Sequence, residues 1–314
     1  MTTRRTLLAT AAGLALALTG LPAMAQDEYP TKPITMLVGY GAGGQTDLIA
    51  RASAKVLADQ LGQPVNVVNK PGAGGAVAAN ELRGMAPDGY TILFQSNAVI
   101  NAAPFLMDRV DFKPDDFEYA GMITAYQTGL AAPKDAPYED LTGFIAWARE
   151  NPDFAYAALS AEARMYMDRI AEQEGLQANA VPVQSGSEMV NTLLAKQVAV
   201  AFSGGIHYRY PDEIKTIAPT TTFRHPSAPD VPTIEEAGFP LAMDTRTVII
   251  LPKGTPREIL DRISSALKAA ETDPEFVKVT ETANIPIMYY DAAAAAKEMQ
   301  ETYDKNKVIL TGGN

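Results

Sequence analysis

Short apolar runs alternate with helix-type patterns along most of the chain. Residues 34–38 form a continuous apolar run, and residues 49–61 then carry apolar side chains three and four positions apart, ahead of Gly62 and Pro64. The first pattern is typical of a buried strand and the second of a helix with one buried face. Further strands are predicted at 65–68, 90–94, 117–123, 154–158, 180–183, 198–202 and 247–251, with helices at 76–85, 141–149, 165–173 and 189–194. This alternation predicts an α/β protein with largely parallel sheets.

The chain is predicted to close with two helices. Thr255, Pro256 and Glu258 have the spacing of a capping box with proline at the first helical position. Apolar residues at helical spacing follow within 259–267, and the alanine run 292–296 marks the second helix. These features are structural and carry no chemistry.

The first 25 residues have the pattern of an export signal. Arg4 and Arg5 form a basic start, residues 7–21 are apolar, and Ala23 and Ala25 form a small-x-small cleavage site. A membrane anchor is the alternative, but the apolar run is short and contains glycine and proline. We therefore expect an exported protein, cleaved after Ala25, without a stable membrane anchor; the arginine pair leaves general and twin-arginine export both open.

Composition and charge narrow the partners. The chain contains no cysteine, which excludes disulfides and thiol nucleophiles. Its 26 basic and 37 acidic residues give a net charge of −11, and loss of the two signal arginines leaves 24 − 37 = −13. Such a charge disfavours nucleic acids and anionic lipid surfaces. The 314 − 25 = 289 residues that remain suit two lobes better than one core.

A glycine motif follows the first predicted strand. Gly39, Gly41 and Gly44 have the G-x-G-x-x-G spacing of a dinucleotide-binding turn. That interpretation requires an acid at the end of the second strand, where Asn69 stands instead. Two alternatives remain: an anion site made by the amides of residues 42–46 at a helix N-terminus, or a tight turn that needs glycine for steric reasons.

Two further features belong to the same region. Asp47 lies in the first turn of the predicted helix, where its carboxylate would satisfy loop amides and fix the turn. A second glycine loop, at residues 72–75, follows the next strand and would lie at the same sheet edge, either lining the cleft or serving packing.

Catalytic groups are scarce. The only histidines are His207 and His225, neither is spaced from another ligand type as in a metal site, and no G-x-S-x-G pentapeptide occurs. We therefore expect a binding protein that is not an enzyme, with no cofactor and no metal.

Two arginines stand where loops meet elements. Arg164 lies at the start of a predicted helix, where a cation opposes the helix dipole, so it requires either a bound carboxylate or an ion pair with Glu162 or Asp168. Arg246 precedes a predicted strand and is expected to pair with Asp244.

Several longer segments together resemble the Bug-type periplasmic solute receptors of tripartite tricarboxylate transporters. They are "YPTKPITMLVGYGAGGQTDLIAR", "LGQPVNVVNKPGAGG", "APDGYTILF", "PDVPTIEEAGFP" and "LPKGTPREIL", and the resemblance runs from about residue 29 to the C-terminus. It implies a two-lobed type II periplasmic-binding fold that closes about a hinge on a small carboxylate. Lobe 1 would comprise residues 26–125 plus 247–314, and lobe 2 residues 126–246. The receptor would act as a monomer and deliver its ligand to the transporter's membrane components.

The resemblance also implies a set of ligand-binding residues, and this chain departs from the family in part of it. The family's first loop matches Gly41, Ala42, Gly43, Gly44, Gln45, Thr46 and Asp47, and a further cleft position matches Ser96 and Asn97. In the second loop Ser160 is followed by Arg164 at a hydroxyl position and Tyr166 at a histidine position. Gln184 begins a turn that usually contains lysine, and Ser203, followed by Gly204, replaces a frequent aspartate. Gly74, His207 and Arg246 complete the set.

The arginine at position 164 favours a ligand with a second fixed anionic group, hence a di- or tricarboxylate. Two other functions remain open from the sequence. One is a receptor that presents its ligand to a sensor kinase, and the other is an exported enzyme acting on an anionic substrate.

Overall fold

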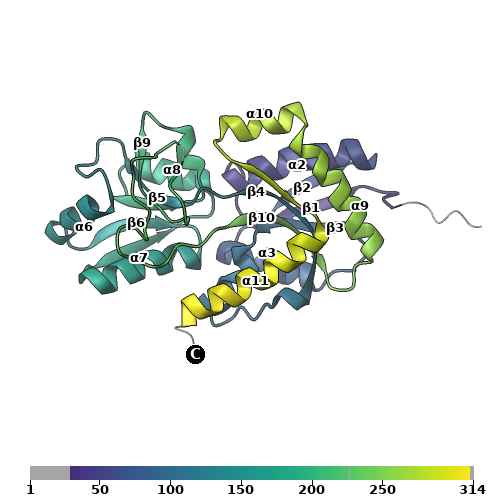
Figure 1. Cartoon of the computed structure of the whole chain (residues 1–314), viewed down its shortest axis with the longest axis horizontal. Coiled ribbons are helices and arrows are strands. Elements are labelled where there is room, and N and C mark those ends of the chain that lie inside the picture. The colour runs from purple at the N-terminus through teal and green to yellow at the C-terminus, as the bar shows by residue number, and fades with distance from the viewer. Residues whose placement is uncertain (1–28, 226, 312–314) are drawn as a thin grey trace, which may run out of the picture.

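The computed structural model describes residues 29–225 and 227–311, which form two lobes joined by a narrow waist (Figure 1). The predicted export signal at residues 1–25 lies outside the described residues. Each lobe has one β-sheet with apolar clusters on both faces. In the part of the chain that is described, no helix combines the length and the apolar character needed to cross a membrane.

The sheet of lobe 1 has six strands in the order β11-β4-β10-β3-β1-β2. β1 is parallel to both of its neighbours, whereas β10 is antiparallel to β3 and β4. The strands are β1 (Ile34–Val38), β2 (Val65–Asn69), β3 (Thr91–Ser96), β4 (Phe117–Ala125), β10 (Arg246–Pro252) and β11 (Ile287–Tyr290). The helices are α2 (Gln45–Leu61), α3 (Ala76–Arg83), α4 (Ala98–Asn101), α5 (Ala103–Leu106), α9 (Arg257–Lys268), α10 (Pro274–Thr282) and α11 (Ala292–Thr311).

The sheet of lobe 2 has five strands in the order β7-β6-β8-β5-β9. β6 is parallel to β7 and β8, and β5 is antiparallel to β8 and β9. The strands are β5 (Gly129–Pro133), β6 (Phe154–Ala158), β7 (Ala178–Pro182), β8 (Val200–Ser203) and β9 (Ile214–Pro219). The helices are α6 (Leu141–Glu150), α7 (Ala161–Glu174) and α8 (Gly186–Leu194), and a 3-10 turn spans Ile206–Arg209.

Two chain segments connect the lobes. The first leads from β4 to β5, and the second leads from the loops after β9 into β10 (Figure 1). They lie side by side, because the Tyr126 amide donates a hydrogen bond to the Thr245 carbonyl at 2.8 Å. Paired crossing segments of this kind form the waist about which two lobes can rotate. The lobe boundaries at residues 125/126 and 246/247 stay a prediction.

All eight predicted strands are present, but the expectation of largely parallel sheets is only partly correct. β10 and β5 lie antiparallel in the interiors of their sheets, so both sheets are mixed. Three strands were missed: β5, β9 and the edge strand β11. The segment of β5, "GLAAP", contains residues typical of turns, and its pairing depends on strands far away in sequence.

The predicted end of the chain is also wrong in two respects. The chain closes with three helices and a strand, because α10 and β11 intervene between α9 and α11. The capping box does not form: the Thr255 hydroxyl donates to the Pro252 carbonyl at 2.7 Å, and α9 begins after Pro256 without a side-chain cap. The Thr255 hydroxyl is therefore used in a turn at the end of β10, and it does not cap α9 as the capping-box motif predicted.

Candidate ligand-binding site

A pocket lies between the two lobes, beside the waist. Lobe 1 contributes the loop after β1, the first turn of α2 and the end of β3, while lobe 2 contributes the first turns of α7 and α8 and the end of β8. The crossing segments form a third side. The lining residues are Tyr40, Gly44, Gln45, Thr46, Ser96, Tyr126, Thr128, Leu159, Ser160, Glu162, Ala163, Tyr166, Gly186, Phe202, Ser203, Gly204, Ile206, Thr220 and Thr245.

Three helices begin at this pocket. α2 follows Gly44, whose missing side chain leaves the first amides of the helix uncapped. α7 follows Ser160, whose hydroxyl accepts from the Ala163 amide at 3.1 Å, and α8 starts at Gly186. Each helix N-terminus carries a partial positive charge of about half a unit. Their convergence therefore gives the pocket a positive potential without a cationic side chain.

The glycine loop is held by Asp47 from behind, as its position in the first turn predicted. The carboxylate accepts from the Gly43 amide at 2.9 Å, from Asn69 at 2.9 Å and from Arg51 at 3.0 Å. Burial raises the pKa of this carboxyl, but the hydrogen bonds outweigh burial and hold its pKa below the ordinary value. Asp47 therefore orders the loop and is not among the residues that line the pocket.

Glycine is required in this loop because the two lobes touch there. The Gly41 amide donates to the Gln184 carbonyl at 2.8 Å. A Cβ at Gly41 would lie 3.0 Å from that of Ser185, and one at Gly44 would lie 3.0 Å from the Gly186 amide. The tight-turn alternative is thus correct in part, since close approach between lobes is what excludes larger residues.

The second glycine loop packs against the first. A Cβ at Gly39 would lie 2.6 Å from the Cα of Gly75, and one at Gly74 would lie 3.2 Å from the Cβ of Ser160 in lobe 2. The Gln95 side chain joins the two loops, accepting from Gly39 at 3.0 Å and donating to the Gly74 carbonyl at 3.2 Å. This loop supports the site and contacts the other lobe without lining the pocket itself.

Serine hydroxyls supply directed donors. Ser96, Ser160 and Ser203 each accept a backbone amide, from Ala98, Ala163 and Gly205 respectively, at 3.1–3.2 Å. A hydroxyl that accepts in this way still has its own proton to donate. The pocket thus presents three O–H groups of fixed position.

Three further polar atoms on the wall lack partners. Among the described residues, the buried Oε1 of Gln45, Oη of Tyr166 and Oγ1 of Thr245 have no hydrogen-bond partner. The neighbouring Thr46 hydroxyl is by contrast bonded to the Tyr126 hydroxyl at 2.7 Å. Buried polar atoms without partners are rare, and a ligand is a common reason for them.

Aromatic rings form much of the remaining wall. Tyr166 stacks on Phe202 with ring centroids 5.4 Å apart and an interplanar angle of 17°, and Tyr40 and Tyr126 line the pocket from lobe 1 and the waist. Burial raises the pKa of each tyrosine well above its ordinary value, so all three are neutral.

Glu162 is the one charged side chain among the residues that line the pocket, within the described chain. It lies in the first turn of α7 and is half-buried, and burial raises its pKa to about 7. The sequence pattern indicates Glu162 only as a partner for Arg164. Acids are common in the first turn of helices, so its position gave no signal of a pocket.

The sequence prediction named eight residues that line this pocket, and the structure brings them together from both lobes. They are Gly44, Gln45, Thr46, Ser96, Ser160, Tyr166, Ser203 and Gly204. Lining residues that it missed include Tyr40, Tyr126, Thr128, Glu162, Gly186, Phe202, Thr220 and Thr245. Most of these are aromatic or lie near the waist, where the sequence pattern carries no mark of the cleft.

Other predicted residues lie beside the pocket. Gly41, Ala42 and Gly43 belong to the loop behind it, and Asn97 binds the backbone of Arg246 through both its amide and its Oδ1. Gly74, Arg164 and Gln184 line a neighbouring interlobe cavity, which shares only Tyr40 and Leu159 with the main pocket. Ligand contact at these positions stays a prediction.

Arg164 is not among the residues that line the main pocket. It lines the neighbouring cavity and a surface hollow beside α5, and within the described chain no ion pair joins it to Glu162 or Asp168. Neither expected ion pair therefore forms among the described residues, although Asp168 lines the same surface hollow as Arg164.

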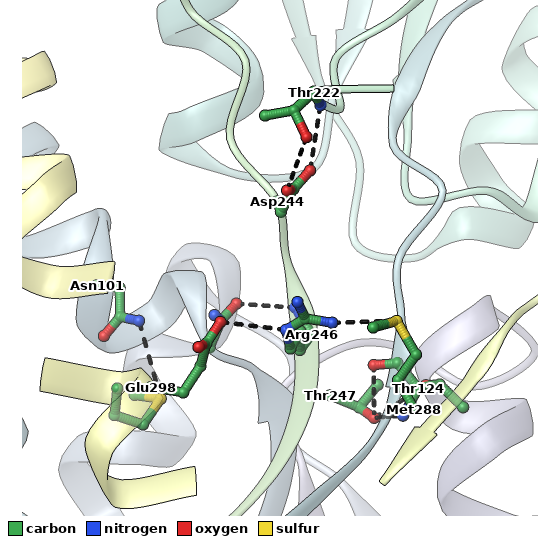
Figure 2. Close-up of polar contacts among 10 residues, drawn as sticks. Asn101, Thr124, Thr222, Asp244, Arg246, Thr247, Met288 and Glu298 are labelled. Atoms are coloured by element: carbon green, nitrogen blue, oxygen red, sulfur yellow. Dashed lines mark hydrogen bonds and ion pairs between the residues drawn. The ribbon is translucent and has the colours of Figure 1, made fainter. Parts of the chain in front are cut away.

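Arg246 binds an acid other than the predicted one. Its Nε donates to Glu298 on α11 at 3.2 Å, and its guanidinium lies 5.0 Å from the centre of the Tyr290 ring. Asp244 instead accepts from the amide and hydroxyl of Thr222, at 3.2 and 3.0 Å (Figure 2). The expected pair with Asp244 is thus wrong, because the chain direction at the waist turns these two side chains toward different lobes.

His207 lies behind the pocket wall. Its Nε2 is 2.9 Å from the Thr216 hydroxyl, and its ring packs on Tyr208, which stacks on His225. Burial, followed by the proximity of His225, lowers the pKa of His207 to about 3, so the ring is neutral. No described group of three or more His, Cys, Asp or Glu side chains is placed to hold a metal ion.

Two α/β lobes with a pocket between them at the waist define a periplasmic binding protein. The model of the tripartite tricarboxylate transporter family receptor matches residues 49–314, and the chain belongs to this family. It is 32% identical over 307 residues to the UPF0065 protein in the gbd 5' region of Cupriavidus necator, covering 96% of this chain and 93% of that protein. It is 30% identical over 258 residues to the protein BugT of Bordetella pertussis, covering 79% of each chain.

A solved structure has the same fold. The periplasmic binding protein BugD superposes with a TM-score of 0.82 at 25% identity, covering 91% of this chain and 98% of BugD. The type II two-lobed fold expected from the sequence is confirmed. The chain is therefore a solute-binding protein associated with transport.

Proposed function

We propose that this protein is a periplasmic receptor that closes on a small carboxylate and delivers it to the membrane components of a tripartite tricarboxylate transporter. The observation that carries the proposal is the convergence of the N-termini of α2, α7 and α8 on one interlobe pocket. Backbone amides and fixed hydroxyls at such a place bind an anion without the cost of burying a cationic side chain.

The carboxylate would lie against Gly44, Thr46 and Gly186, with serine hydroxyls as further donors. The interlobe hydrogen bond from Gly41 to Gln184 supports coupling between binding and closure, because the same loops hold the ligand and touch each other. A ligand that contacts both lobes stabilises the closed form by its difference in affinity for the two forms.

Family membership supports the periplasm as the compartment and a transporter as the partner. The expected di- or tricarboxylate rested on Arg164, which faces the neighbouring cavity. A second anionic group would have to reach that cavity to meet this guanidinium. The residues of the main pocket therefore support the binding of one carboxylate.

Thermal-shift screening of residues 26–314 against small carboxylates, followed by calorimetry, tests the proposal. Each carboxylate is paired with its neutral amide, for example succinate with succinamide. Because a ligand that binds only the folded protein raises Tm, carboxylates should stabilise and the amides should not. Stabilisation by neutral solutes alone would contradict carboxylate binding.

A variant pair separates pocket contact from helix capping. Ser160→Ala removes a cap hydroxyl that lines the pocket, and Asp140→Ala removes the equivalent cap of α6, which is not among the lining residues. Both should lower the free energy of unfolding by about 1 kcal/mol. Only Ser160→Ala should also weaken binding of the carboxylate ligand.

A further inference from the structure

We propose that the ligand carries an ammonium group beside its carboxylate, so that the pocket selects amino carboxylates, and that Glu162 is the residue that binds the ammonium. This inference rests on the carboxylate receptor proposed above and specifies the chemical class of its ligand.

Glu162, the one ionisable acid that lines the pocket within the described chain, has no partner for its carboxylate. Within the described chain, the Glu162 carboxylate makes no hydrogen bond or ion pair, and no Lys, Arg or His lines the pocket. A carboxylate placed in a half-buried site without a partner is unfavourable. A cationic ligand group supplies the missing partner.

The surroundings of Glu162 are suited to a cation. The influence of its charge reaches Tyr40, Tyr126 and Tyr166, whose pKa values it raises further after burial. These rings come from three different segments of the chain, and Phe202 stacks on one of them. Aromatic faces around a carboxylate attract an ammonium through cation–π contact in addition to the ion pair.

A second acceptor lines the same pocket, from α2 of lobe 1. The Oε1 of Gln45 is buried, lines the pocket and has no hydrogen-bond partner among the described residues. An ammonium has three protons to donate, so Glu162 and Gln45 together could receive two of them. A ligand carboxylate has no proton to donate, so it would satisfy neither ionised Glu162 nor Gln45.

Charge balance also disfavours a second carboxylate in this pocket. One ligand carboxylate is matched by the partial positive charges of the helix N-termini, but a second would lie in the same small space as Glu162 and repel it. Arg164, which could have balanced it, lines the neighbouring cavity. A zwitterionic ligand would place its carboxylate near the helix N-termini and its ammonium near Glu162, so each charge would meet its opposite.

The test uses pairs of ligands that differ only by the amino group. Calorimetry on the wild-type protein compares alanine with propanoate, aspartate with succinate, 4-aminobutanoate with butanoate, and phenylalanine with 3-phenylpropanoate. We expect the best amino member to bind at least about tenfold tighter than its partner. In Glu162→Gln that ratio should fall to about one, because the amide keeps the shape and loses the charge.

Glu258→Gln is the matched control. Glu258 is an exposed acid in the first turn of α9, outside the pocket, and its change should leave the ratio as in the wild type. Equal or tighter binding of the compounds without the amino group, or a ratio unaffected by Glu162→Gln, overturns the inference while the carboxylate receptor stands. If no carboxylate binds with or without the amino group, both proposals fail.

A measurement on the wild type alone covers the case in which Glu162→Gln does not fold. The other titratable groups lining the pocket, within the described residues, are Tyr40, Tyr126 and Tyr166, all neutral at the pH values used. Affinity for the amino carboxylate should rise between about pH 6 and pH 8, as Glu162 ionises. Affinity that falls over this range, as for a dicarboxylate receiving a proton from neutral Glu162, overturns the inference.

Discussion

The Gly41 amide and the Gln184 carbonyl, which belong to different lobes, are joined by a 2.8 Å hydrogen bond. The contact is possible because Gly41 has no side chain: a Cβ would lie 3.2 Å from the same carbonyl oxygen. The loop that borders the candidate carboxylate site is therefore also the surface on which lobe 2 rests. Ligand binding and closure share one set of backbone atoms.

Gly41→Ala should weaken ligand binding about tenfold or more, because the added methyl group separates the lobes at their contact. The free energy of unfolding of the ligand-free protein should change little, since an open form relieves the clash. Calorimetry and urea unfolding measure the two quantities. Gly84→Ala is the control, because a Cβ there has its closest contact at 3.7 Å and lies at the end of α3. Unchanged affinity in Gly41→Ala would show that closure does not use this contact.

Asp47→Asn should lower the free energy of unfolding by about 2 kcal/mol near neutral pH. An asparagine places an N–H₂ group against donors from Asn69 or Arg51, which the carboxylate now accepts. Because the folded-state pKa of this acid is lowered, its contribution is complete above the unfolded value near 3.8 and is lost as pH falls below it. The difference between variant and wild type in urea should therefore shrink in acid. Asp59→Asn, an exposed acid on the same helix, should show no such difference.

Glu162→Gln should stabilise the ligand-free protein above neutral pH. Burial raises the pKa of Glu162 from 4.5 to about 7, so the folded state binds a proton more tightly than the unfolded state. The free energy of unfolding of the wild type thus falls as pH rises through this window, by up to about 3 kcal/mol, and stays low above it. The variant should lack this decline. Parallel pH profiles for wild type and variant would mean that Glu162 is well solvated.

Arg246→Met should lower the free energy of unfolding by about 1–2 kcal/mol, through loss of the partly buried pair with Glu298 and the contact with Tyr290. A double-mutant cycle with Glu298→Gln measures the coupling. Arg257→Met, which breaks an exposed pair with Asp261, should cost less than about 0.5 kcal/mol. A loss of ligand affinity greater than the loss of stability would instead assign Arg246 a binding role.

Arg164→Ala should change the affinity for a small carboxylate by less than about threefold, since Arg164 lines the adjacent cavity. Calorimetry with the ligand identified in the screen decides this. A loss of tenfold or more would restore the ligand with a second anionic group, reaching from the main pocket into that cavity.

The sequence predicted those parts of the fold whose pattern is local. The strand at residues 34–38 and the helix after it were found because an unbroken apolar run and a helical apolar stripe are visible within a few residues. The role of Asp47 in holding a loop amide was predicted for the same reason, whereas anion binding by the glycine loop stays a prediction. β5, with its glycine and alanines, is a strand only because β8 and β9 lie on either side of it.

Helix α7 gives a second example of a feature that the local sequence pattern does not reveal. Glu162 and Arg164 are two residues apart on α7, and side chains at that spacing project in different directions. The sequence pattern favoured the arginine, whereas the packing of the lobes turns the glutamate into the pocket. Which side of a helix faces a cleft between two lobes depends on how both lobes dock, and no local pattern records that.

The position of β10 has a consequence for how the chain folds. β10 lies between β3 and β4 in the first sheet, yet all of lobe 2 is synthesised before it. Until residue 252 has been synthesised, β3 and β4 lack β10, the strand that lies between them. The strands of lobe 2, by contrast, come from one continuous segment of the chain. Lobe 2 can therefore complete its sheet first, and lobe 1 becomes whole only when the returning segment inserts at its centre.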